Sequence, residues 1–194
     1  CSAVAGCRYP PAIKKPAGLK ESVPFILLSL SLGIILSAFA SRKSALTAWI
    51  SLLAAHFYIV AAILFNTGPI YFVEIVYYLG GVIVTFLLGY TCLVRIKSID
   101  NDIALNRFHG YVYEKETTGL VFLLATVGVI GFPVTTAFIG VDIFFTYVHS
   151  DQFILITLLA LCFVFIELTA FRILLRVFFG PYKKQNHPIA FRSS

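Results

Sequence analysis

Charged side chains are scarce in this sequence. Only 12% of its 194 residues are charged, whereas 59% are hydrophobic, and the mean hydropathy is +0.92. Soluble domains carry about a quarter charged residues, and they avoid large exposed apolar patches. The deficit of charge therefore excludes a soluble enzyme, a disordered chain and a secreted disulfide scaffold. It predicts an integral membrane protein.

The sequence also lacks the motifs of covalent and metal chemistry. Its four cysteines form no CxxC pair and no Cys/His cluster with metal spacing, so we expect no metal, haem or other cofactor. It has no Ser/His/Asp arrangement, phosphate-binding loop or nucleotide fingerprint, and it thus offers no catalytic site. The net charge is +6, and the positive residues lie between the apolar runs. This distribution indicates membrane topology and argues against a nucleic-acid-binding patch.

Methionine is absent altogether, and the sequence starts with Cys1. We therefore expect the chain to be processed, truncated or a fragment of a longer protein. Cys1 also matches the lipid-modified start of a bacterial lipoprotein, although an arbitrary fragment boundary is the simpler interpretation. Cys1 and Cys7 are candidates for a disulfide outside the cell. Cys92 and Cys162 lie in apolar runs, where packing is their simplest role.

Long uncharged runs dominate the rest of the chain. A helix that crosses a bilayer needs about 20 mostly apolar residues, and these runs are too long, and too little alternating, for strands. We predict an all-α integral membrane bundle of about five transmembrane helices. The predicted spans are 24–41, 44–65, 70–96, 117–149 and 152–180. The other predicted segments are an N-terminal tail (1–21), a connector (97–116) and a C-terminal tail (183–194).

The distribution of Lys and Arg predicts the orientation. If connecting segments alternate between sides, one side receives nine of these cations: Arg42, Lys43, Arg95, Lys97, Arg107, Lys115, Lys183, Lys184 and Arg192. The other side receives four, all in the N-terminal tail: Arg8, Lys14, Lys15 and Lys20. The positive-inside rule then puts the connector and the C-terminus in the cytoplasm and the N-terminus outside, as for a multi-pass protein of the bacterial inner membrane.

The fourth predicted span contains a helix break. Its 33 residues would extend for about 50 Å as one helix, which is too long for a straight crossing. Pro133 removes a backbone donor, and Gly131 weakens the preceding turn. Broken helices at membrane depth line cavities or lie buried in protein, and in transporters they mark ion sites. Asp142, which follows the break, is thus a proton-relay candidate; a plain proline kink with Asp142 at the headgroups is the alternative.

Four further ionisable residues lie within the predicted spans. Glu167 is the strongest candidate proton relay, because an ionisable group in lipid costs a few kcal/mol unless it faces the bundle or pairs. Arg172 is either its positive neighbour or an arginine that snorkels to the headgroups. His56 can relay protons near neutral pH, or it is a hydrogen-bonded packing residue. Glu74 suits the helix dipole in a first turn, and it is the weakest of these candidates.

Several segments of the second half resemble a known family. They are LNRFHGY at 105–111, GLVFLLATVGVIGFP at 119–133, AFIG at 137–140, Asp142, and FRILLRVFFGP at 171–181. Together they resemble the late helices of the antiporter-like membrane subunits. This family comprises the proton-pumping subunits of respiratory complex I (NADH-quinone oxidoreductase), the Mrp cation/proton antiporters, and the membrane partner of bacterial DAB inorganic-carbon uptake. The resemblance implies proton or cation translocation beside a broken helix. It also implies other membrane subunits as partners, with a soluble peripheral subunit as a further candidate.

The sequence departs from that family at two positions. Val141 stands where the family has Lys or Glu before the acid, and Val60 stands at the lysine position of the family's His-x-x-x-Lys helix if His56 is aligned with its histidine. The resemblance covers about residues 105–182, and the family proteins are longer. We therefore expect a C-terminal part or a split subunit that depends on a partner. A non-pumping scaffold subunit and a small solitary secondary transporter remain alternatives.

Overall fold

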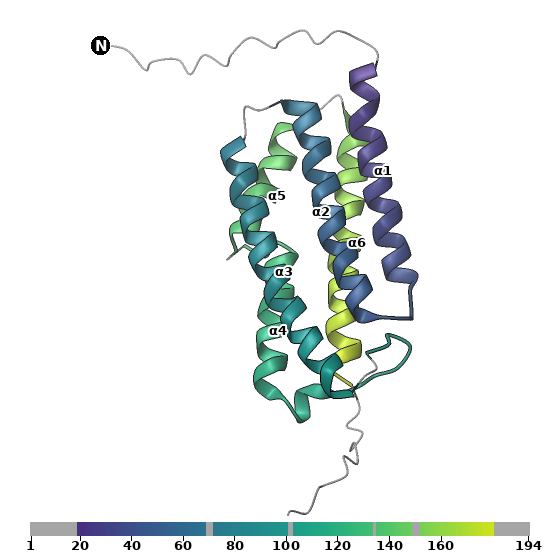
Figure 1. The fold of residues 1–194 in the computed structure, drawn as a ribbon. Helices are drawn as coiled ribbons and strands as arrows, with labels where there is room; N and C mark the ends of the chain where they lie inside the picture. The colour runs from purple at the N-terminus through teal and green to yellow at the C-terminus, as the bar shows by residue number, and fades with distance from the viewer. Residues whose placement is uncertain (1–18, 69–71, 101–102, 134, 149–151, 181–194) are drawn as a thin grey trace, which may run out of the picture.

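The described part of the chain is almost entirely helical. The computed structural model describes residues 19–68, 72–100, 103–133, 135–148 and 152–180, and no strand occurs in these ranges (Figure 1). The helices are α1 (Leu19–Ala40), α2 (Ala45–Thr67), α3 (Phe72–Asp100), the short 3₁₀ helix η2 (Tyr111–Tyr113), α4 (Glu116–Val129), α5 (Thr136–Tyr147) and α6 (Phe153–Val177). The prediction of an all-α bundle is confirmed.

Four of these helices have the length and composition of membrane spans. α1, α2, α3 and α6 are each long and apolar enough to cross a membrane, which is the architecture of a multi-pass membrane protein. The predicted fourth span is instead two shorter apolar helices, α4 and α5. The helix break predicted at Gly131 and Pro133 is therefore confirmed, because both residues lie between the end of α4 and the start of α5.

The helices pack in two groups that α2 joins. α1 packs along α2 and α6, whereas α3 packs along α4 and α5. Figure 1 shows α4 and α5 following one another along the length of α3, so that the two half-helices together take the place of one span. α2 contacts α1, α3 and α6, and it is thus the central helix of the bundle.

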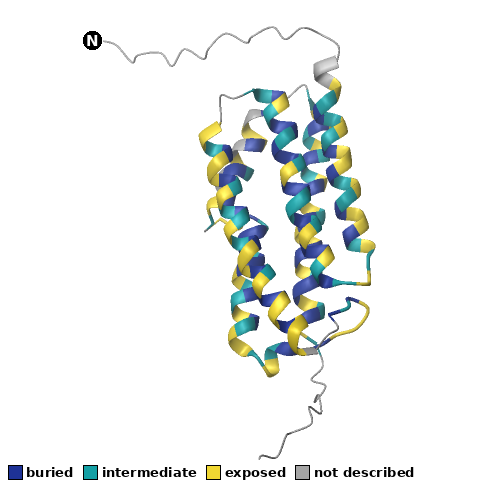
Figure 2. Ribbon diagram, viewed as in Figure 1, coloured by how far each residue is buried: buried dark blue, intermediate teal, exposed yellow. Residues whose placement is uncertain are grey.

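Burial follows this arrangement. The buried residues of α2 recur every three or four positions, for example Trp49, Leu52 and Ile59, as expected for a helix face that packs on neighbours. Trp49 Nε1 donates a hydrogen bond to the carbonyl of Phe86 in α3 (3.0 Å). In Figure 2 the buried residues lie on inward faces and the exposed ones on outward faces. Many outward residues are large and apolar, and Phe153 is 74% exposed, which suits contact with lipid.

Two ends of the bundle can be distinguished. The α1–α2 link, the segment before α4 and the end of α6 meet at one end through backbone hydrogen bonds: Ala45 to Ile103, His109 to Arg176, and Val112 to Phe178. At the other end the side-chain amides of Asn66 and Gln152 donate to each other (3.1 and 3.2 Å). The described cations that were predicted for one side therefore share one end. Cys1, Cys7 and the terminal cations, such as Arg8, Lys14, Lys183 and Arg192, lie outside the described residues.

Candidate functional site

A histidine and a tyrosine form a hydrogen-bonded pair inside the bundle. His56 lies in the middle of α2, and its Nδ1 is 2.6 Å from the hydroxyl of Tyr78 in α3. Both side chains are fully buried, at 0% exposure. The imidazole tautomer decides which of the two groups donates the proton. His56 was predicted as a relay candidate or a packing residue, and Tyr78 is a partner that the sequence analysis missed.

The second ring nitrogen of His56 is buried without a partner. Among the described residues, nothing forms a hydrogen bond with His56 Nε2. Leaving such a group unsatisfied costs about 1–3 kcal/mol, so natural proteins rarely retain one without a reason such as a chemical role. An imidazole that is bonded through one nitrogen and unbonded at the other can accept a proton at one side and pass one on at the other.

The Tyr78 ring is held by α5. Phe144 packs edge-to-face against it, with ring centroids 4.9 Å apart and an interplanar angle of 69°. Gly140 lies one turn before Phe144, and a Cβ atom at Gly140 would overlap the Tyr78 ring. The second half of the broken helix is therefore in direct contact with the His56–Tyr78 pair.

Two other polar side chains lie near the pair. The Ser31 hydroxyl of α1 donates to the carbonyl of Ala55 (3.1 Å), the residue before His56. The Cys162 thiol of α6 donates to the carbonyl of Leu28 in α1 (3.5 Å), one helical turn before Ser31. Ser31, His56, Tyr78 and Cys162 are all buried, and we call them the polar core. Cys162, which was predicted to be a packing residue, is thus also part of a polar cluster.

A glycine-type C-cap ends α4 at the break. Gly131 has φ +73°, its N–H donates to the Gly128 carbonyl (3.2 Å), and the Phe132 N–H donates to the Val127 carbonyl (3.2 Å). This pair of bonds around a left-handed residue is the Schellman motif. The chain then passes the exposed Pro133 and restarts as α5. The Thr135 hydroxyl and the Thr135 backbone N–H both donate to the Phe132 carbonyl (2.8 Å each).

Small residues bring the break close to the polar core. A Cβ at Gly81 of α3 would overlap the side chain of Thr136, and a Cβ at Gly128 of α4 would overlap that of Thr85. Gly81 is three residues after Tyr78, so the two lie on one face of α3, less than a helical turn apart. The start of α5 therefore lies about one turn from Tyr78 along α3.

Among the described residues, the other predicted ionisable side chains form no hydrogen bond with the polar core, although Glu74 lies one helical turn before Tyr78 on α3. Asp142 on α5 and Glu167 near the middle of α6 are both exposed, and Glu74 is half-buried in the first turn of α3. The guanidinium carbon of Arg172 is 5.3 Å from the centroid of the Phe39 ring. Among the described residues, the charged groups that act on Arg172 are two other arginines, Arg176 and Arg42, and no ion pair joins Arg172 to Glu167.

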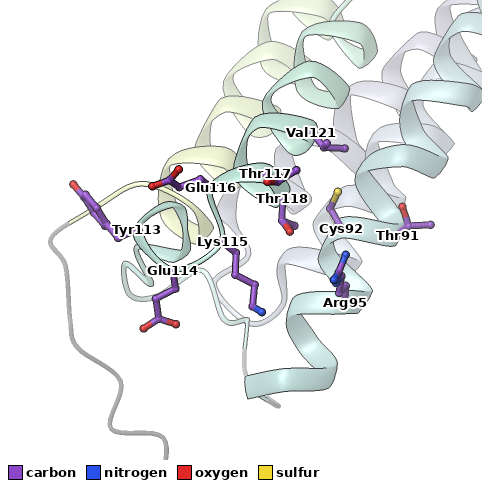
Figure 3. Close-up of a pocket in the computed structure, with 10 residues that line it drawn as sticks. All are labelled: Thr91, Cys92, Arg95, Tyr113, Glu114, Lys115, Glu116, Thr117, Thr118 and Val121. Carbon is purple, nitrogen blue, oxygen red and sulfur yellow. The ribbon is translucent and has the colours of Figure 1, made fainter.

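A wide opening lies at the cation-rich end, between α3 and the start of α4 (Figure 3). It has a volume of about 740 Å³, and its lining includes Arg95, Lys115, Glu114 and Glu116. In Figure 3 Lys115 extends toward Arg95, whereas Glu114 points away from the opening. Its charges are balanced in sign. In the part of the chain that the structure describes, no group of three His, Cys, Asp or Glu side chains is placed to hold a metal ion.

One sequence signal identifies Tyr78 in retrospect. Ile75, Tyr78, Val82 and Phe86 recur at helical spacing and are all buried, whereas the adjacent Tyr77 is exposed. The spacing places Tyr78 on the inner face, but only the packing of α2 against α3 pairs it with His56. Comparison with protein-family models, curated proteins and solved structures gives no match to this chain.

Proposed function

We propose that this chain is a membrane subunit of a proton-translocating, antiporter-like complex, and that His56 and Tyr78 are its proton-transfer pair. The observation that carries the proposal is the buried His56 imidazole, with Nδ1 at 2.6 Å from the Tyr78 hydroxyl and Nε2 unpartnered among the described residues. The contact between Tyr78 and the second half of a broken helix supports it, because such breaks mark ion sites in transporters.

The proton step uses the two ring nitrogens of His56 and the hydroxyl of Tyr78. A proton that binds to Nε2 converts His56 to the imidazolium, in which the Nδ1–H donates to the Tyr78 oxygen. When the Nδ1 proton passes to the Tyr78 oxygen, the hydroxyl releases its own proton to a water molecule beyond it, and His56 becomes a neutral imidazole with its proton on Nε2. Because Phe144 and Gly140 of α5 contact the tyrosine ring, a small shift of α5 would move the hydroxyl relative to Nδ1 and would gate the transfer.

The exposed acids support an assembly. Glu167 is exposed near the middle of a 25-residue apolar helix, where contact with lipid would cost a few kcal/mol. A neighbouring membrane subunit with a basic or hydrogen-bonding side chain removes this cost. Asp142, exposed on α5, is the second such contact. The cation-rich end would face the cytoplasm of a bacterium and could also receive a soluble peripheral subunit.

A non-pumping scaffold subunit is the second candidate. It is favoured by the separation of Asp142, Glu167 and Arg172 from the polar core, and by valine at positions 60 and 141. In this case His56 only packs against Tyr78. The exposed acids would then bind neighbouring subunits and would not belong to a proton path. A small solitary transporter would instead purify without any partner.

Proton flux through the whole assembly separates the two candidates. The chain would be isolated in mild detergent with everything that accompanies it, reconstituted into vesicles, and followed with an internal pH-sensitive dye. We expect His56→Gln to lower flux by about 100-fold, the range of a lost acid–base group, while the subunits remain together. His109→Gln is the matched control, because His109 is also buried but its Nε2 lies 2.9 Å from the Ala104 carbonyl at the bundle end. Wild-type flux in His56→Gln would establish the scaffold.

A further inference from the structure

Three arginines, two from α6 and one from the α1–α2 link, line one small pocket. The pocket has a volume of about 370 Å³ and is lined by Arg42, Arg172 and Arg176, with Phe39 and Asn106 beside them. Arg42 belongs to the α1–α2 link, Asn106 to the segment before α4, and the other two arginines to the last two turns of α6. This volume lies within the range of small-ligand sites.

Two of the three arginines are held in place by aromatic rings, whereas Arg42 is exposed. Arg172 lies over Phe39, and the guanidinium carbon of Arg176 is 4.3 Å from the centroid of the Phe108 ring. Such cation–π contacts fix a guanidinium while they leave its N–H donors free to bind an oxyanion. Arg172 and Arg176 are also half-buried, so they are not simply extended into water.

The charge in this pocket is of one sign. Among the described residues, Arg172 has Arg176 and Arg42 as its charged neighbours, and like charges four residues apart on a helix repel. The opening in Figure 3 differs, because it is lined by Glu114 and Glu116 as well as by Arg95 and Lys115. The favourable position of Arg176 at a helix C-terminus explains that residue alone. It leaves the meeting of three guanidinium groups unexplained.

The location of the pocket suggests the source of the anion. It lies where α1 ends at Ala40 and where α6 is about to end, which is the level of the headgroups if these helices cross a bilayer (Figure 1). Leu36 of α1 and Leu168 of α6 lie one turn deeper and are exposed. A phospholipid with its phosphate in the pocket would therefore lay its acyl chains along this apolar surface.

We propose that Arg42, Arg172 and Arg176 form a binding site for the phosphate of an anionic phospholipid. Planar guanidinium groups match phosphate oxygens in geometry, and basic pockets between transmembrane helices suit acidic headgroups. Asn106 adds an amide donor for the remaining headgroup atoms. The site is independent of proton transfer, and it would exist in a scaffold subunit as well.

The test is lipid-dependent stability of the purified protein with its native partners. Phosphatidylglycerol added to a neutral detergent is expected to raise the thermal unfolding midpoint of the wild type, as a ligand of the folded state does. Phosphatidylcholine is expected to raise it less. In the Arg172→Gln/Arg176→Gln variant the phosphatidylglycerol shift is expected to disappear, with an apparent affinity at least about tenfold lower.

The matched control is Arg95→Gln/Lys97→Gln, which removes the same charge from exposed positions of α3 at the same end of the bundle. It is expected to retain the phosphatidylglycerol shift. An equal shift in the wild type and in Arg172→Gln/Arg176→Gln would overturn the proposal. Inorganic phosphate that produces the full shift without lipid would also overturn it, because the site would then bind the free anion.

Discussion

Tyr78 connects the two features on which the proposed function depends. Its hydroxyl meets His56 Nδ1, and its ring lies against the Gly140 backbone and the Phe144 ring of α5. The position of this one side chain therefore sets both the hydrogen bond to the histidine and the distance between α3 and the second half-helix. A glycine is required at position 140 because any larger side chain would occupy the space of the ring.

A methyl group at position 140 is expected to destabilise the bundle. Gly140→Ala forces the Tyr78 ring or α5 to move, and overpacking of this kind costs about 1–3 kcal/mol. Gly80→Ala on α3 is the control, because no atom lies within 4 Å of its added Cβ and alanine favours helix by up to about 1 kcal/mol. In detergent, the thermal unfolding midpoint of Gly140→Ala should thus be lower than that of the wild type, and the midpoint of Gly80→Ala should equal or exceed it. The reverse order would show that Tyr78 does not pack closely on α5.

Residue patterns predicted His56 as a candidate but not its environment. The chemistry of a histidine within an apolar run is readable from the sequence, whereas the pairing with Tyr78 depends on which faces of α2 and α3 meet. The same limit explains Glu167 and Asp142. The sequence predicted how deep these two acids lie in the spans. Their outward orientation depends on how α5 and α6 pack on the neighbouring helices, which the sequence did not predict.

Among the helices, the break between α4 and α5 is the feature that the sequence predicted most directly. Pro133 and Gly131 both indicated it, and the interpretation gave the main role to the proline. In the structure the stop is made by Gly131, whose left-handed conformation allows the two capping hydrogen bonds, and Pro133 follows it. A proline at this place prevents the helix from resuming immediately, which is a secondary role.

Substitutions at these two positions are expected to differ in effect. Gly131→Ala forces an alanine into a left-handed backbone conformation, which costs about 1–2 kcal/mol of folding free energy. It also places the new Cβ 3.1 Å from the Val141 side chain. Pro133→Ala leaves the cap intact and should cost less, since Pro133 is exposed. Unfolding midpoints of the two variants in the same detergent measure the difference. A larger decrease in the unfolding midpoint for Pro133→Ala than for Gly131→Ala would show that the proline is the main cause of the helix break.

For the molecule as a whole, the described cations of the connecting segments lie at one end of the bundle, in agreement with the prediction from their spacing. The α1–α2 link and the segment before α4 are joined by the hydrogen bond from Ala45 N–H to the Ile103 carbonyl (3.1 Å). The opposite end is marked by the Asn66–Gln152 amide pair. The arginine pocket was not predictable, because its residues come from segments that are far apart in the sequence.

Thiol labelling is expected to report these two ends as two sides of the membrane. With the four native cysteines replaced by serine, single cysteines would be placed at Ser41 and Asn106, and at Thr67 and Gln152. A membrane-impermeant maleimide should label the first two from the cytoplasmic side and the last two from the outside. Labelling of Ser41→Cys and Gln152→Cys from the same side would contradict the assignment of the spans.

The central claim, that the His56–Tyr78 pair transfers protons, is tested most directly by removing one oxygen atom. Tyr78→Phe retains the ring that packs against Phe144 and deletes only the hydroxyl that meets His56. Tyr90→Phe, further along α3 where the ring stacks on Phe86, is the matched control. In vesicles that contain the complete assembly, we predict that Tyr78→Phe lowers proton flux by about tenfold or more, while Tyr90→Phe equals the wild type. Wild-type flux in a stable, fully assembled Tyr78→Phe complex would contradict the claim.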